Sequence, residues 1–145
     1  MIGILIHSKC SISIIVEIIL KTIKKKKIAM FCYTYDIWFD NNYIVECSNY
    51  PLDTLIELIK ENGVSIQETT IWGSVNKASV NDIPHTYNDF CNSDYSIIID
   101  CYDFEYVAVF CKDRAFLDEI TKSLTSPSVT VERIMNADIA QELRF

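Results

Sequence analysis

The stretch IIIDCYDFEYVAVFC, residues 97–111, decides the fold. Its two ends, Ile97–Ile99 and Tyr106–Cys111, are apolar at consecutive positions, which is typical of central strands covered on both faces. The connection between them, residues 100–104, is short enough for the turn of an antiparallel hairpin. The stretch therefore predicts two paired strands in the middle of a sheet, joined by an acidic turn.

Helix and strand patterns alternate on both sides of this hairpin. Ile12, Ile15, Val16 and Ile19 recur at spacings of three and four, which predicts an amphipathic helix that Ser11 or Ser13 caps. The other helices are predicted at residues 51–62, with Gly63 just past the end, at 87–91, and at 114–126 with Asp113 as the cap. Strands are predicted at residues 2–7, 28–35, 36–40, 43–47, 66–75 and 129–132, with a turn at Asn41-Asn42.

The order of these elements defines the fold class. Residues 2–73 and 66–134 each follow the order β-α-β-β-α-β, which is the order of ferredoxin-like folds. With 145 residues and 50% hydrophobic content, the chain is long enough to bury one sizeable core. We expect a single α+β domain over residues 1–145, with a mixed, mostly antiparallel sheet and helices packed on it. Two ferredoxin-like halves are a finer description of the same order.

Charge is distributed unevenly along the chain. The formal net charge is −7, but residues 1–27 carry six lysines and one acidic residue, and residues 28–145 therefore carry −12. Between Ala78 and Cys111 there are six acidic residues and no lysine or arginine. Lysines 24–27 end a predicted helix, where the dipole favours cations, and a binding patch is the alternative. Because an acidic surface repels phosphates, nucleic-acid binding is not expected, whereas a basic protein partner is.

No export signal, membrane span or metal motif is predicted. The apolar run Ile12–Ile23 is interrupted by Glu17 and Lys21, and its positive charges follow it, the reverse of a signal peptide. The six cysteines contain no C-x-x-C pair, and only two histidines are present. We expect reduced thiols and a cytoplasmic protein without cofactor or bound metal.

Candidate binding residues are acidic and aromatic rather than catalytic. Cys91 and His85 are the best nucleophile and base pair, but their spacing does not secure contact, so no catalytic residue is predicted. The carboxylates around the hairpin could bind a divalent cation, meet a basic partner, or keep the turn solvated. The aromatic residues between Phe31 and Tyr43 fit a core or an interface. The predicted partner-binding residues are Asp36, Trp38, Asp40, Asp89, Asp94, Asp100, Tyr102, Asp103 and Glu105.

Four segments resemble an uncharacterised family of small Firmicutes proteins, a domain of unknown function. They are Thr86–Phe90, Ser93-Asp94, Ile97–Asp100 and Tyr106–Asp113, so the resemblance is strongest from Thr86 to Asp113. The resemblance implies no activity, and it implies a bacterial, cytoplasmic setting.

These observations predict a non-catalytic acidic binding protein of the immunity or inhibitor kind. Its partner would be a basic protein, such as a nuclease toxin. The alternative is a small-molecule-binding or regulatory α+β domain. Either would act as a monomer or as a homodimer, and a dimer of the second kind would form through a sheet edge.

Overall fold

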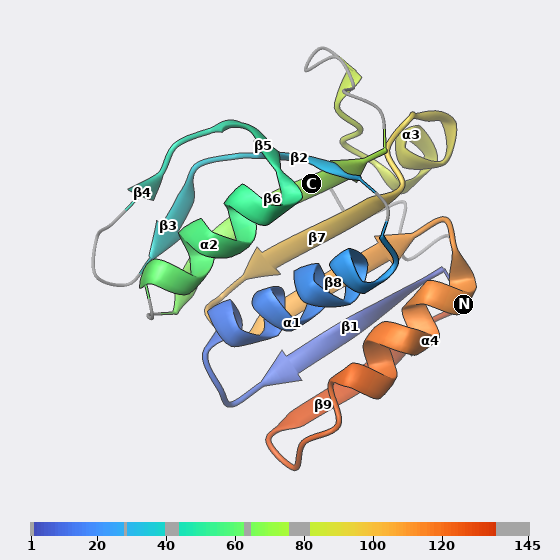
Figure 1. Cartoon of the computed structure of the whole chain (residues 1–145). Helices are drawn as coiled ribbons and strands as arrows, with labels where there is room; N and C mark the ends of the chain where they lie inside the picture. The colour runs from blue at the N-terminus through green and yellow to red at the C-terminus, as the bar shows by residue number, and fades with distance from the viewer. Residues whose placement is uncertain (1, 28, 40–43, 63–64, 76–81, 136–145) are drawn as a thin grey trace.

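The computed structural model describes residues 2–27, 29–39, 44–62, 65–75 and 82–135. Over these residues the chain is an α+β protein with a large sheet and helices packed on it (Figure 1). Gly63 and the predicted Asn41-Asn42 turn lie outside the described residues. The helices are α1 (Ile12–Lys25), α2 (Leu52–Asn62), α3 (Tyr87–Asn92) and α4 (Arg114–Ser123). The strands are β1 (Gly3–Ser8), β2 (Phe31–Thr34), β3 (Ile37–Phe39), β4 (Ile44–Val45), β5 (Ser48–Pro51), β6 (Ile66–Ser74), β7 (Ile97–Tyr102), β8 (Tyr106–Cys111) and β9 (Val129–Ile134).

All of the described strands belong to one sheet. Its order is β4-β3-β6-β7-β8-β1-β9, and β2 pairs with β6 and β5. Every pairing among the described strands is antiparallel. Strand β1 lies between β8 and β9, so strands from both halves of the chain intermix. Two separate ferredoxin-like halves are therefore not confirmed.

The hairpin at residues 97–111 lies in the middle of the sheet, as predicted, but its turn is shorter than expected. Strand β7 continues through Asp100 to Tyr102. Ile97 pairs with Cys111, and Tyr102 pairs with Tyr106. The prediction that Asp100 begins the connection is wrong, because pairing with β6 and β8 on both sides holds this residue in the strand.

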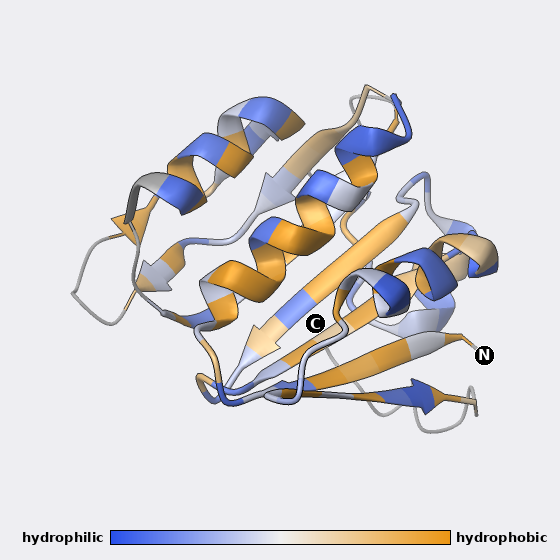
Figure 2. Ribbon diagram, turned by 60° about the horizontal axis from the view of Figure 1, so that its bottom comes forward, coloured by the Kyte–Doolittle hydropathy of each residue, from blue (hydrophilic) through white to orange (hydrophobic). Residues whose placement is uncertain are grey.

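Three helices cover one face of the sheet. Helices α1, α2 and α4 pack side by side on it (Figures 1 and 2). Asp113 caps α4 as predicted, since its Oδ1 accepts from the Phe116 amide at 3.3 Å. Ser11 precedes α1, but its side chain makes no capping hydrogen bond. Strand residues that face these helices form the main core with them: Ile4, Ile6, Cys32, Ile37, Ile66, Ile71, Ile97, Ile99, Cys101, Val107, Val109 and Cys111.

The opposite face is covered only in part. Helix α3 and the segment around it supply Phe90 and Tyr95, which pack with Trp72, Ile98 and Phe110 in a second, smaller cluster. The indole Nε1 of the fully buried Trp72 donates to the Pro84 carbonyl oxygen at 3.2 Å. This cluster covers one end of the face, and the described residues leave the other end accessible.

A β-bulge in β6 keeps apolar residues on the helix side. Trp38 pairs with Glu68 and its neighbour Phe39 pairs with Ile66, so Gln67 is an extra residue in the ladder. Without it, Ile66 and Ile71 would point to opposite faces, because side chains alternate along a strand. Both belong to the core beneath the helices.

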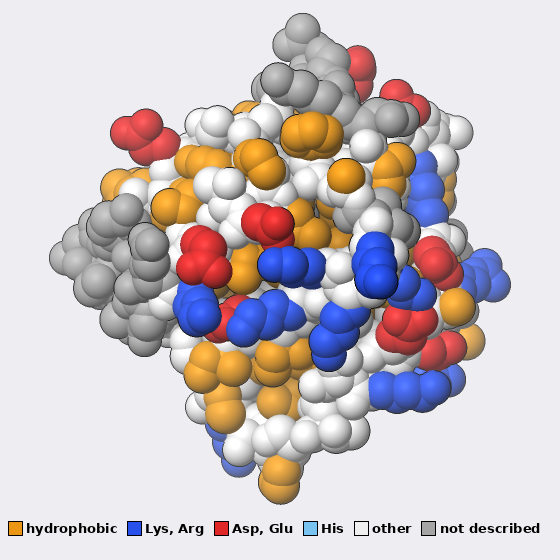
Figure 3. Space-filling model, viewed as in Figure 1, with side chains coloured by type: hydrophobic (Ala, Val, Ile, Leu, Met, Phe, Trp, Pro, Cys, Tyr) orange, Lys and Arg blue, Asp and Glu red, His pale blue; other side chains and the backbone are white. Residues whose placement is uncertain are grey.

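Lysines of α1 and of its C-cap form ion pairs on the helix-covered side of the molecule. The Lys21 Nζ atom lies 2.6 Å from Glu17 Oε1, and the Lys24 Nζ atom lies 2.9 Å from Oδ1 of Asp53 in α2. Lys26 lies 2.5 Å from Glu119 of α4. Figure 3 shows basic side chains over α1 with carboxylates beside them. The positive charge of residues 1–27 is thus partly compensated by acidic residues of the neighbouring helices.

Gly3 provides a test of this packing. A Cβ atom at this position would meet the Phe110 ring at 2.7 Å and the Val109 carbonyl oxygen at 2.8 Å. Because the backbone oxygen belongs to a paired strand, we expect Gly3→Ala to lower the free energy of unfolding by about 1–3 kcal/mol. Urea titration measures this. Lys9→Ala, in the exposed loop after β1, is the control and should change it by less than about 0.5 kcal/mol.

Candidate functional site

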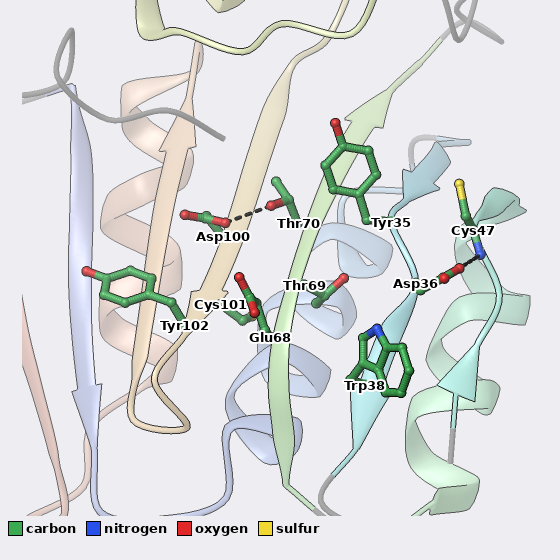
Figure 4. Close-up of a pocket in the computed structure, with 10 residues that line it drawn as sticks. All are labelled: Tyr35, Asp36, Trp38, Cys47, Glu68, Thr69, Thr70, Asp100, Cys101 and Tyr102. Atoms are coloured by element: carbon green, nitrogen blue, oxygen red, sulfur yellow. Dashed lines mark hydrogen bonds between the residues drawn. The ribbon is translucent and has the colours of Figure 1, made fainter. Parts of the chain in front are cut away.

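The uncovered end of the sheet holds a cavity of about 650 Å³. Its walls come from β3 and the residues before it, from Cys47 between β4 and β5, from β6, and from β7. Figure 4 shows their side chains around this space, with the helices behind the sheet. The lining residues are Tyr35, Asp36, Trp38, Cys47, Glu68, Thr69, Thr70, Asp100, Cys101 and Tyr102.

Asp100 is the half-buried carboxylate of this cavity. Its neighbours in β7, Ile99 and Cys101, face the helices, so alternation turns Asp100 to the uncovered face. Its Oδ1 accepts a hydrogen bond from the Thr70 hydroxyl at 2.7 Å. Burial raises the pKa of Asp100 to about 6, the hydrogen bond from Thr70 lowers it, and the nearby charge of Glu68 raises it. The cavity therefore contains a carboxyl group that titrates well above its usual range.

Aromatic side chains form the other part of the lining. Trp38 is 45% exposed and is the register partner of Glu68 on the adjacent strand. The Tyr35 ring packs edge-on against Trp72, with the ring centres 4.6 Å apart. This contact joins the cavity to the covered half of the face.

A row of stacked rings extends from the cavity across β7, β8 and β1. Tyr102 and Tyr106 are stacked with centres 5.4 Å apart, and Tyr106 stacks on His7 at 4.9 Å. His7 Nε2 lies 3.3 Å from the Glu105 carboxylate. Beside the cavity, the uncovered face therefore carries a row of three stacked rings with Glu105 next to its His7 end.

The turn between β7 and β8 has a strained backbone. Asp103 and Phe104 both have positive φ, 53° and 60°, and the Glu105 amide donates to the Tyr102 carbonyl oxygen. Two consecutive positive φ values are typical of a type I′ hairpin turn, which favours asparagine and glycine. A phenylalanine in this conformation is a costly choice. Phe104 is also 45% exposed.

The structure brings together some of the predicted site residues. Asp36, Trp38, Asp100 and Tyr102 line the cavity, and Asp103 and Glu105 lie in the adjoining turn. Asp89 and Asp94 do not join them, since they line a different cavity beside α3. Asp89 belongs to the capping box of α3 with Thr86. Asp40 lies outside the described residues.

Sequence reasoning missed six further cavity residues. They are Tyr35, Cys47, Glu68, Thr69, Thr70 and Cys101. The Cys47 amide donates to Asp36 Oδ1 at 2.6 Å, so this residue orients a predicted one. Glu68 and Thr70 belong to a continuous polar run in β6, residues 67–70. That polar run inside an otherwise apolar strand is the signal that could have found them.

The described residues hold no metal site, because no three histidine, cysteine, aspartate or glutamate side chains come together in a suitable group. All six cysteines are free, as predicted, and Cys32, Cys101 and Cys111 are buried. Among the helices that the structure describes, none combines the length and the apolarity needed to cross a membrane.

The titration of Asp100 predicts a pH dependence of stability. Between about pH 4, where the unfolded carboxyl titrates, and pH 6, the folded state binds more protons, so stability falls as the pH rises. Asp100→Asn cannot ionise. The free energy of unfolding of Asp100→Asn minus that of the natural protein should therefore be about 2 kcal/mol larger at pH 7 than at pH 4. Urea titrations across this range measure it.

A second variant tests the cause of this effect. Thr70→Val removes the hydrogen bond that favours the charged carboxylate, so the fall in stability should extend to higher pH. A difference between Asp100→Asn and the natural protein that stays constant from pH 4 to 7 would contradict the burial of Asp100.

Comparison with known proteins places the chain in a family without assigning an activity. No curated protein matches it, and no solved structure does. Residues 1–143 match the model of the family described as "Protein of unknown function (DUF2691)". The uncharacterised family predicted from Thr86–Asp113 is thus confirmed over almost the whole length, and the chain belongs to the DUF2691 family.

Proposed function

We propose that this protein is a non-catalytic acidic binding protein that engages a basic protein partner through the uncovered end of its sheet. The observation that carries the proposal is the convergence of Asp36, Asp100 and Glu68 with Trp38 on one cavity. Carboxylates attract and orient a basic surface, and exposed aromatic rings provide the apolar contact.

The distribution of ion pairs supports the proposal. On the helix side, Lys21 and Lys24 of α1 and its C-cap Lys26 are paired with carboxylates. On the uncovered side, no described lysine or arginine pairs with Asp36, Glu68 or Asp100. The negative charge of the cavity is therefore uncompensated within the described part of the chain, and a basic partner would neutralise it.

The proposal includes an immunity-like or inhibitor-like role and a cytoplasmic location. Six free cysteines support a reducing compartment. A partner such as a toxin would have to present a basic surface to the cavity and to the β7–β8 turn.

Small-molecule binding is the second candidate. One observation favours it, the cavity volume of about 650 Å³, which falls within the range of small-molecule sites.

Affinity capture with matched variants tests the binding proposal. Asp36→Asn/Asp100→Asn removes two cavity charges, whereas Asp89→Asn/Asp94→Asn removes two charges beside α3 and leaves the same net charge. From a lysate of the encoding organism, we expect the natural protein and the α3 variant to retain the same basic protein, and the cavity variant to lose it. Quantitative mass spectrometry measures retention. Retention of only acidic proteins, or equal loss with both variants, would contradict the proposal.

A variant of the turn residue Phe104 tests the effects on stability and on partner binding separately. Phe104→Gly places glycine where φ is positive, so it should raise the free energy of unfolding by about 0.5–1 kcal/mol. If Phe104 contacts the partner, the same variant should retain less of the captured protein. Urea titration and capture measure the two effects. Reduced stability would show that the turn is not strained, and unchanged retention would exclude Phe104 from the interface.

A further inference from the structure

Two carboxylates in the cavity have acceptor positions that the described protein leaves unused. Thr70 donates to Asp100 Oδ1, but no described residue donates to its Oδ2 or to the Glu68 carboxylate. Glu68 is exposed and also destabilises the charged form of Asp100. A single cation between these two groups would relieve their repulsion and fill the unused acceptor positions.

The aromatic neighbour restricts the shape of that cation. Trp38 pairs in register with Glu68 on the adjacent strand, and both side chains line the cavity. Figure 4 shows Trp38 on one side of Glu68 and Asp100 on the other. A planar guanidinium can stack on a ring while its edge donates to carboxylates. An ammonium is a compact point charge without this flat, forked arrangement of donors.

The size of the cavity permits a whole side chain. Its volume of about 650 Å³ exceeds that of a guanidinium group alone. It is also bounded by Tyr35 and Tyr102, whose rings can flank an aliphatic stem. An arginine side chain on the surface of a protein therefore fits the lining in charge, in shape and in length.

We propose that the cavity between β3, β6 and β7 binds a guanidinium group, with Glu68 and Asp100 as its acceptors and Trp38 as its stacking surface. The guanidinium is that of an arginine presented by the basic partner, so this inference rests on the proposed function. A free guanidinium compound has the same chemistry, and the experiment separates the two sources.

Titration of the isotope-labelled protein with short blocked peptides tests the inference by NMR. The peptides have the sequence Gly-Ser-X-Ser-Gly, where X is arginine, lysine or the neutral arginine analogue citrulline. We expect the arginine peptide to shift amide signals of β3, β6 and β7, with an affinity about tenfold above that of the lysine peptide. The citrulline peptide should cause no shift in these strands. Equal affinity for arginine and lysine would overturn the inference.

Agmatine, a small molecule with a guanidinium group, identifies the source of the ligand. Weaker binding of agmatine than of the arginine peptide supports a protein partner. If agmatine binds as tightly as the peptide, the guanidinium inference still holds, but the small-molecule function is favoured over the proposed one. If neither compound binds while the captured basic protein still does, the proposed function stands and the guanidinium inference fails.

Matched variants locate the site. Glu68→Gln and Asp100→Asn keep the size of the side chain but remove its charge and replace one acceptor oxygen with an NH2 donor. Each should therefore weaken binding of the arginine peptide about tenfold while the spectrum stays that of a folded protein. Trp38→Leu should weaken binding of the arginine peptide without changing the net charge of the protein. Asp89→Asn removes the same charge beside α3 and should have no effect. A loss with Asp89→Asn equal to that with Asp100→Asn would show that net charge alone attracts the peptide, and would overturn the inference.

Discussion

The alternation of side chains along β7, held between β6 and β8, is the constraint on which the rest of the structure depends. Pairing on both sides fixes its register. That register sends Ile97, Ile99 and Cys101 into the core under the helices. It sends Ile98, Asp100 and Tyr102 to the other face. A shift by one residue would exchange these sets and bury a carboxylate beneath the helices, at a cost of several kcal/mol.

The unequal covering of the two faces turns this alternation into a candidate site. One face is covered by three helices, whereas the described residues place on the other only the short helix α3 and the segment around it. Polar positions such as Thr70 and Asp100 are tolerated in central strands because they lie where the cover ends. The site is thus a part of the sheet that the described chain leaves without apolar cover.

The fold was largely predictable because its signals are local. The helix periodicity, the Asp113 cap and the strands at residues 97–111 can each be read within a short window, and all were confirmed. The sheet order could not be predicted, because it depends on pairings such as β1 with β8, between residues about a hundred positions apart. The bulge at Gln67 was also missed, since nothing in its neighbours marks an extra residue.

The candidate site was predictable only in part for the same reason. Asp36, Trp38, Asp100 and Tyr102 were chosen for charge and aromatic character, but Glu68 and Thr70 join them only through the pairing of β6 with β3 and β7. Asp89 has the same charge but lines a different cavity, beside α3. Its carboxylate accepts from the Thr86 amide at the start of α3, a structural role.

The two walls of the cavity differ in how firmly the sheet holds them. Thr70 and Asp100 lie on strands that are paired on both sides, so local opening there requires separation of the central sheet, and their amide hydrogens should exchange slowly. Trp38 lies on β3, which has three residues and pairs outward with the two residues of β4. In the proposed binding of a partner, any adjustment would therefore come from the aromatic wall, while the carboxylate wall would remain in place. Such binding would need orientation rather than folding, which favours fast association.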